Sequence, residues 1–416
     1  MLKKYLSITF VLLSFSIAFS QEKEVLPPFN IKTISLVQSG QNALPIFRLG
    51  DSFQLQFDDL NATEDNYYYI IKHYDYDWKP SQLSRNEYLI GFDDQRIMDY
   101  TNSFNALQIY SHYRVSFPNK NTQLKVSGNY IISVVDENRD VVFSRKIIVY
   151  EDLVSVPMQI KRARDVRQIE KKQNIDFSIK TSAFTFQNPL QNIKVLLMQN
   201  GKFNNAISNI KPMYTIGNDL IYKYDTETQF WGGNEYLFFE NKNIQAANNS
   251  IARIDANSGL YNSYLYTNES RANKQYTYWP DINGNFLINA LNRENPEIEG
   301  DYAWVYFSLS ASSFIQNKNI YITGMFNNNV LSDENKMDYN AKKGVYEKAI
   351  MIKQGFTNYN YTIADPNGVI DNENAVDGNF YQTENDYFAI VYYRENGQRY
   401  DRIIGKGIAT STNIIN

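Results

Sequence analysis

Cysteine is absent from this chain of 416 residues, and histidine occurs only twice, as His73 and His112. Without cysteine there are no disulfide bonds, no thiolate catalysis and no cysteine-ligated metals, so each core must be stable through burial alone. The formal net charge is only −4, with acidic and basic residues interleaved, and no basic field is present to attract nucleic acid. This composition disfavours both nucleic-acid binding and metal or acid–base enzymology.

Beyond residue 20 no apolar stretch is long enough to span a bilayer, so we expect no membrane-spanning segment. The first twenty residues differ from the rest. Lys3 and Lys4 precede an apolar and hydroxyl run, and the run ends with small residues at Ala18 and Ser20. We predict a signal peptide over residues 1–20 and Gln21 as the first mature residue, which makes the protein soluble and exported. No cysteine follows, so a lipid anchor through cysteine is excluded.

The composition is typical of a β-protein. Aromatic residues make up 15% of the chain, 33 of them tyrosine, and such side chains pack well on a pleated surface. Short apolar runs recur about every ten residues between turn signals, which is the pattern of sandwiches and barrels. Residues 53–57 (FQLQF) alternate cleanly, so Phe53, Leu55 and Phe57 should share one face of a strand. We therefore predict an all-β fold.

Breaks in the pattern divide the chain into three expected domains. The signal peptide is followed by an N-terminal sandwich over residues 21–152 and a middle sandwich over residues 153–298. The charged segment 293–300, which has no periodicity, marks the start of a C-terminal early-set-like sandwich over residues 299–416. The spacing of the strands suits immunoglobulin-like sandwiches. We expect three of them in a row, forming an elongated molecule.

The segment 73–78 (HYDYDW) is a weak candidate for a metal site. Alternation along a strand would place His73, Asp75 and Asp77 on one face, where an imidazole and two carboxylates could bind a metal. We favour a plainer interpretation, in which this polar face meets solvent at the end of a strand and the intervening aromatic side chains pack inside. Those aromatic residues are Tyr74, Tyr76 and Trp78.

Other patterns give no site. Residues 281–285 (DINGN) and 365–368 (DPNG) faintly resemble calcium loops, but neither ends in the acidic residue that completes such a loop, and both suit β-turns. There is no Gly-x-Ser-x-Gly elbow, phosphate loop or zinc-protease pair. Asp225, Glu227 and Asp255 could supply a carboxylate pair for glycoside hydrolysis, at background frequency. We predict no catalytic, cofactor-binding or metal-binding residue, and hence no enzyme.

Four aromatic residues crowd one polar segment and form the candidate partner-binding site. They are Tyr266, Tyr276, Tyr278 and Trp279, close to Asn268, Arg271 and Lys274. Aromatic rings beside amides and charges suit a protein interface, where they supply contact area at low entropic cost. They suit sugar stacking or an ordinary sandwich core equally well.

Several longer runs carry a family resemblance. In the first domain these are residues 74–92 (YDYDWKPSQLSRNEYLIGF), 100–104 (YTNSF) and 110–118 (YSHYRVSFP). Later ones are residues 283–286 (NGNF), 299–307 (EGDYAWVYF) and 387–394 (YFAIVYYR). Together with the signal peptide and the length, they resemble the type IX secretion plug protein family over essentially the whole mature chain.

The resemblance implies a periplasmic, non-enzymatic protein built of β-sandwich domains. Such a protein binds the periplasmic opening of a very large outer-membrane β-barrel translocon and seals it by steric occlusion. It has no cofactor and is expected to act as a monomer within a hetero-complex, held at the outer membrane by its protein partner. The resemblance transfers no contact residues.

A local resemblance supports an alternative function. Residues 321–329 (YITGMFNNN), 344–347 (GVYE) and 360–363 (NYTI) are similar to the early-set sandwiches of glycogen-binding modules. Those modules usually carry a tryptophan just after the Phe-Asn pair to stack on glucose, and here Asn328 and Asn329 stand instead. The alternative is therefore a periplasmic glycan-binding protein that would use residues near Tyr321 and Phe326.

Overall fold

The computed structural model describes residues 21–257, 259–310, 315 and 317–414, and the predicted signal peptide lies outside them. Strands dominate the described residues. The helices are single turns: α1 (Arg85–Tyr88), α2 (Pro189–Asn192), α3 (Pro296–Glu299), and the short 3-10 turns η1 (Met325–Asn327) and η2 (Ser411–Asn413). The prediction of an all-β fold is confirmed.

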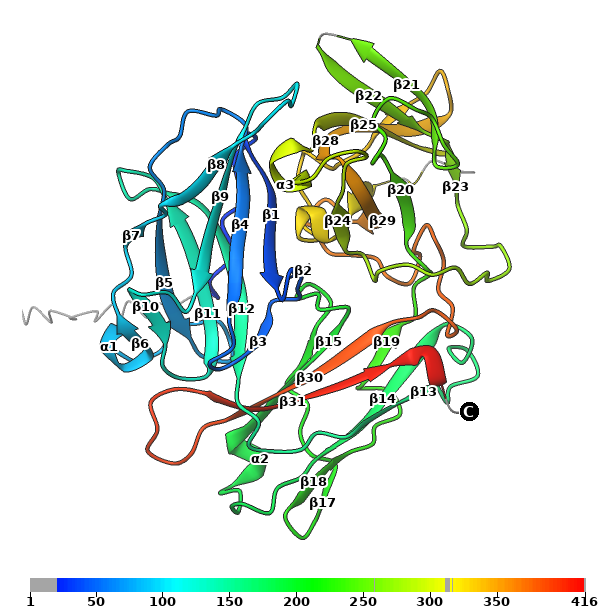
Figure 1. Ribbon diagram of the computed structural model, residues 1–416. Helices are drawn as coiled ribbons and strands as arrows, with labels where there is room; N and C mark the ends of the chain where they lie inside the picture. The colour runs from blue at the N-terminus through cyan, green and yellow to red at the C-terminus, as the bar shows by residue number, and fades with distance from the viewer. Residues whose placement is uncertain (1–20, 258, 311–314, 316, 415–416) are drawn as a thin grey trace, which may run out of the picture.

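The first unit consists of two five-stranded sheets that face each other across an aromatic core (Figure 1). One sheet contains, in spatial order, β2 (Gln41–Asn42), β1 (Ile31–Gln38), β4 (Phe53–Asp59), β9 (Ser111–Phe117) and β8 (Asp99–Asn102). The other contains β3 (Ile46–Arg48), β12 (Val141–Tyr150), β11 (Gly128–Val135), β5 (Tyr68–Tyr74) and β7 (Gln95–Arg96). The strands β6 (Leu89–Gly91) and β10 (Thr122–Leu124) pair with each other. Phe53, Leu55 and Phe57 are all buried, as their alternation predicted.

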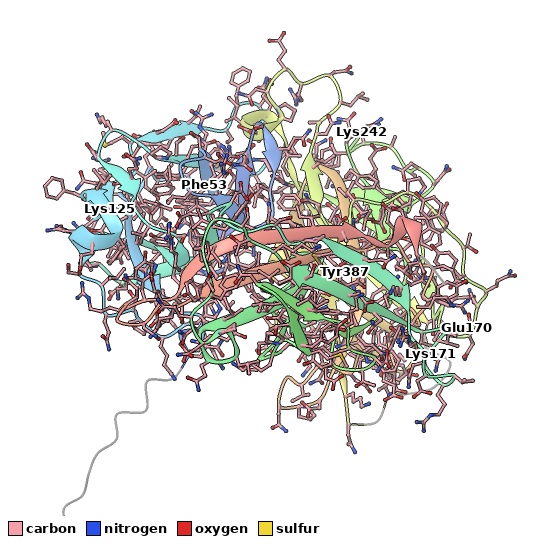
Figure 2. The ribbon with its side chains drawn as sticks, turned by 90° about the horizontal axis from the view of Figure 1, so that it is seen from below. Phe53, Lys125, Glu170, Lys171, Lys242 and Tyr387 are labelled. Atoms are coloured by element: carbon pink, nitrogen blue, oxygen red, sulfur yellow. The ribbon has the colours of Figure 1, made fainter. Side chains whose placement is uncertain are left out.

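The middle unit is assembled from two distant parts of the chain. One sheet contains β13 (Met158–Arg162), β14 (Lys172–Ile179), β18 (Asp219–Tyr222) and β17 (Tyr214–Ile216), and β19 (Gln229–Trp231) also pairs with β14. The facing sheet contains β16 (Ile207–Ser208), β15 (Ile193–Gln199), β30 (Asp386–Tyr393) and β31 (Arg402–Thr410). Figure 2 shows β31, in red, crossing the molecule beside the labelled Tyr387 of β30.

The third unit lies between these two parts in the sequence. Its larger sheet contains β21 (Ile251–Asn257), β22 (Leu260–Leu265), β25 (Tyr302–Ser310), β28 (Val345–Lys353) and β27 (Asp338–Asn340), with β23 (Asn268–Glu269) also paired to β25. The smaller sheet contains β20 (Leu237–Glu240), β29 (Gly355–Ala364) and β24 (Phe286–Ile288), with β26 (Asn319–Thr323) also paired to β29.

This strand pairing differs from the expected order of consecutive sandwiches. The strands β20 to β24, expected in residues 153–298, belong to the third unit, and β30 and β31, expected in residues 299–416, belong to the middle unit. The physical reason is the seven-residue pairing of β30 with β15, from Ile193 opposite Tyr393 to Gln199 opposite Tyr387. Local periodicity identifies β30 as a strand but carries no information about a partner so far away in the sequence.

The three units pack as a triangle rather than in a row (Figure 1). Because β30 is buried on both faces, it serves two cores. Tyr387 and Val391 face the core of the middle unit, whereas Phe388, Ile390 and Tyr392 pack against the first unit. The first unit also meets the third in a smaller cluster, whose buried members are Leu60, Tyr110, Tyr302 and Met351. The predicted elongated arrangement is therefore wrong.

A buried group of charges and hydroxyls joins the first unit to the third. Asp58 of β4 is fully buried, and its Oδ1 lies 2.6 Å from Nδ1 of His112. Its Oδ2 accepts hydrogen bonds from Nζ of Lys353 (2.6 Å) and from the hydroxyl of Tyr302 (2.6 Å), both in the third unit. The ammonium of Lys353 also donates to the carbonyl of Glu297 at 2.5 Å. Each buried charge therefore has a partner.

The electrostatics of this group hold Asp58 ionised. Burial alone would raise the pKa of Asp58, but the charge of Lys353 and the hydrogen bond with His112 outweigh it, so the pKa lies below its ordinary value. Burial lowers the pKa of Lys353, and the nearby carboxylate opposes that change. The carboxylate and the ammonium thus stabilise each other where water cannot reach them.

Removing one member of the Asp58–Lys353 pair should destabilise the folded protein. In Lys353→Met the buried Asp58 loses its cation, and we expect the free energy of unfolding to fall by roughly 3–5 kcal/mol. The double variant Asp58→Asn/Lys353→Met leaves no unpaired charge and should recover most of that loss. Urea denaturation followed by tryptophan fluorescence measures each value. The exposed Lys342→Met is the control, and a loss no larger in Lys353→Met than in the control would contradict the assigned role.

Candidate partner-binding surface

Three of the four predicted contact aromatics lie together, in the loop between β23 and β24. The Tyr276 hydroxyl donates to the carboxylate of Glu235, and the Tyr278 hydroxyl donates to Oε2 of Glu384 (3.3 Å). The indole Nε1–H of Trp279 donates to the carbonyl of Tyr236 (2.8 Å). These bonds order the loop against the segments that precede β20 and β30.

The fourth aromatic, Tyr266, follows β22 and shares none of these partners. Its backbone N–H donates to the carbonyl of Ser250 (3.3 Å). Its side chain is 54% exposed, close to the 56% of Tyr278, whereas Tyr276 and Trp279 are half-buried. Two of the four residues are therefore open to a partner, and the other two mainly hold the loop in place.

A buried glutamate lies beneath this loop. Glu235 is buried, and burial raises its pKa to about 7, although the hydrogen bonds from Tyr276 and from the backbone N–H of Glu384 oppose the change. Arg271 does not neutralise its carboxylate, because the guanidinium donates to Oδ1 of Asp377 (2.8 Å) and to the backbone carbonyl of Glu235 (2.8 Å). The charge state under the loop therefore changes close to neutral pH.

A turn separates the residues of segment 73–78, which was considered as a metal site. β5 ends at Tyr74, and the backbone N–H of Trp78 then bonds to the carbonyl of Asp75 (2.9 Å), so strand alternation does not continue. Asp75 pairs with Arg394 (2.7 Å), and Asp77 pairs with Lys79 (2.8 Å). No group of three or more potential metal ligands occurs in the part of the chain that the structure describes.

The prediction that His73, Asp75 and Asp77 face solvent is partly wrong, because His73 is buried. Its Nδ1 lies 2.8 Å from the Ser81 hydroxyl, its ring packs among Tyr88, Tyr130 and Tyr400, and burial lowers its pKa to about 4. The prediction that the intervening aromatic residues pack inside is confirmed: Tyr74, Tyr76 and Trp78 are buried.

These aromatic residues bind the middle unit. The Tyr76 hydroxyl donates to the carbonyl of Val195 (3.0 Å), and its backbone N–H donates to Oδ2 of Asp401 (3.0 Å). Asp401 is also paired with Arg394 (3.0 Å) and Lys194 (3.1 Å). The most specific run of the sequence therefore builds a contact between two units of the same chain.

The remaining sequence candidates are structural. Asp281 accepts a turn bond from the backbone N–H of Asn283 (2.7 Å) and a long-range bond from that of Tyr236 (2.5 Å). Asp365 accepts turn bonds from the backbone N–H groups of Asn367 (2.9 Å) and Val369 (2.8 Å).

The carboxylates considered for hydrolysis have separate partners. Asp225 pairs with Arg164 (2.9 Å), Glu227 accepts from the Thr226 hydroxyl (2.7 Å), and Asp255 pairs with Arg253 (3.5 Å). Asp255 lies on β21 of the third unit, whereas Asp225 and Glu227 lie between β18 and β19 of the middle unit, so Asp255 belongs to a different sheet from the other two.

The positions considered for glycan binding face other parts of the chain. Tyr321 is buried, Phe326 packs against the third unit's core, and Asn328 donates to Oε2 of Glu24 (2.7 Å). On the outer face of the larger sheet, Tyr264 and Tyr306 stack on each other with ring centroids 4.4 Å apart.

That stacking is unsuited to sugar binding. The Arg253 guanidinium lies 4.0 Å from the centroid of the Tyr264 ring, and Tyr306 stacks on the same ring. Protein groups therefore occupy the faces of Tyr264 on which a sugar would stack. Nothing at these positions supports the alternative function.

Comparison with known proteins identifies the chain. Residues 31–151, which include both sheets of the first unit, match the family described as "Type 9 secretion system plug protein 1st domain". A crystal structure of a hypothetical protein from Parabacteroides merdae is similar over 93% of this chain and 98% of that one, with 32% sequence identity and a TM-score of 0.89. No curated protein matches.

The sheets of the described residues define an all-β sandwich protein. The chain belongs to the type IX secretion plug protein family. It is thereby a component of type IX secretion. None of the helices in the described residues has the length and apolar character needed to cross a membrane.

The buried glutamate gives the surface a measurable pH dependence. The folded-state pKa of Glu235 is above its unfolded value, so folding favours the protonated form, and its contribution to stability is lost as the pH rises through about 7. We expect Glu235→Gln to raise the melting temperature by a few degrees at pH 8 and to change it little at pH 5. The exposed Glu373→Gln is the control. Equal shifts at both pH values would contradict the assignment.

Proposed function

We propose that this protein is a non-enzymatic periplasmic plug, which binds and seals the periplasmic opening of the outer-membrane translocon of type IX secretion. The family match over the first unit carries the proposal. The resemblance of the mature chain to plug proteins, stated above, implies the same location and partner. Sealing is by steric occlusion, so no reaction is required of the chain.

The packing of the units suits occlusion. A body that blocks a wide pore must resist deformation, and here each unit is fixed to its neighbours. The first unit is joined to the middle unit through the cluster containing Tyr76 and Ile390, and to the third unit through the pair of Asp58 and Lys353. Well-packed interiors deform little, so the three units would move as one body.

The proposal also fits the buried ionisable groups. Asp58, Asp401 and Lys353 are all engaged by other side chains of the protein, so they act as structural contacts.

A plug held without covalent bonds needs an interface of roughly 1,600 Å² or more in total. We propose that it provides this area as a monomer within a hetero-complex.

Affinity purification tests the function directly. The tagged chain is recovered from detergent-solubilised native envelopes, and its partners are identified by mass spectrometry. We expect one very large outer-membrane barrel in near-stoichiometric amount, because a stable seal requires a tight complex. A parallel purification with an unrelated tagged periplasmic protein is the control. Recovery of the chain without the barrel, when the barrel is present in the input, would contradict a stable plug.

The exposed Tyr266 and Tyr278 are proposed contacts of that complex, and Tyr276 and Trp279 hold the loop that carries Tyr278. We expect Tyr266→Ser/Tyr278→Ser to reduce recovery of the barrel several-fold without lowering the melting temperature, because both rings are already open to water. Tyr214→Ser, an exposed tyrosine on β17 of the middle unit, is the matched control. Unchanged recovery in the double variant would remove this surface from the interface.

A further inference from the structure

The loop between β8 and β9, residues 103–110, exposes three large apolar side chains. Phe104 is 60% exposed, Leu107 54% and Ile109 58%. None of the eight residues in the loop (SFNALQIY) carries a charge. The loop projects at the top of the first unit in Figure 1, beyond the ends of both strands and toward the third unit. We call it the apolar loop.

The apolar loop is held firmly by polar contacts with the third unit. The backbone N–H of Phe104 donates to the carbonyl of Ile298 (2.8 Å), and that of Leu107 donates to Oδ1 of Asp301 (2.5 Å). The Tyr110 hydroxyl donates to the carbonyl of Gly300 (2.9 Å). A partner that binds the loop would therefore spend little free energy on ordering it.

The exposed side chains of the apolar loop do not take part in packing between the first and third units. Within the loop, Ala106 and Tyr110 join the cluster between the first and third units. Phe104, Leu107 and Ile109 are absent from that cluster and remain open. An anchored loop that exposes three large apolar side chains, none of which joins the cluster beneath it, is typical of a docking surface.

Charge around the loop indicates what it binds. The neighbouring strand and helix carry Asp99, Glu297 and Glu299, with Glu294 just before the helix. Arg114 pairs with Asp99 (2.9 Å) and lies 3.9 Å from Glu297, and Nε2 of His112 lies 3.6 Å from the same glutamate. Arg293 acts on the carboxylate of Asp301, so basic groups offset part of the charge and an acidic excess is left. An acidic surround is repelled by anionic lipid and attracted to basic side chains. The surroundings therefore favour a protein over a lipid surface.

We propose that the apolar loop inserts Phe104, Leu107 and Ile109 into an apolar pocket with a basic rim on a partner protein. The inference rests on the proposed function for the identity of that partner, the translocon barrel. The apolar side chains supply affinity through burial, and the surrounding carboxylates orient the loop at the rim. The loop would thus be a fixed anchoring point of the plug.

A triple variant tests the inference in the full-length protein. Phe104→Ser/Leu107→Ser/Ile109→Ser should lower recovery of the barrel from detergent-solubilised native envelopes at least tenfold, with an unchanged melting temperature. The matched control carries three serines at exposed apolar positions away from the loop, Ile216→Ser, Val166→Ser and Val369→Ser, and should recover the barrel as the wild type does.

The outcomes separate this inference from the function it rests on. Equal recovery by the wild type and the triple variant would overturn the inference and leave the plug function standing. Failure of the wild type to recover the barrel would overturn both.

A photo-crosslinking residue at position 107, placed in the wild-type background, distinguishes the two kinds of partner. Crosslinks to the barrel would support the proposal, and crosslinks to lipid alone would overturn it.

Discussion

The buried pair of Asp58 and Lys353 is the contact on which the arrangement of the units most depends. Both side chains are almost completely removed from water and lie in different units. A shift between those units would separate the two charges in a medium that cannot solvate either, at a cost of several kcal/mol. The pair therefore specifies how β4 and β28 sit together. The same junction holds the apolar loop through Ile298, Gly300 and Asp301, so the charge pair and the projecting loop share one support.

A second constraint comes from β30, which packs on two cores at once. The chain leaves the middle unit after β19, builds the third unit, and returns to complete the middle sheet with β30 and β31. The third unit is thus held at both of its ends by the middle unit. The aromatic loop containing Tyr278 lies close to these crossings, because its anchors Glu235 and Glu384 immediately precede β20 and β30. The exposed aromatic loop is therefore anchored where the chain passes between the middle and third units, whereas the apolar loop of the first unit is anchored on the third unit itself.

Local features could be predicted from the sequence, and long-range ones could not. The alternation of Phe53, Leu55 and Phe57 identifies a buried face because side-chain direction has a period of two. The pairing of β30 with β15, and of Asp58 with Lys353, joins residues about 200 or more positions apart, and no local pattern encodes such a pairing. In the candidate site, sequence identified a polar aromatic segment. It could not distinguish the exposed Tyr278 from the anchoring Trp279, because exposure is decided by the neighbouring loops.

We propose that the folded protein closes the translocon pore by occupying it. The most direct measurement is the conductance of the purified translocon in a planar bilayer, before and after the protein is added to the periplasmic side. We expect the open-pore current to fall to the baseline of the bilayer and to return when the protein is removed. A current that stays unchanged while the protein remains bound to the translocon would rule out sealing by steric occlusion.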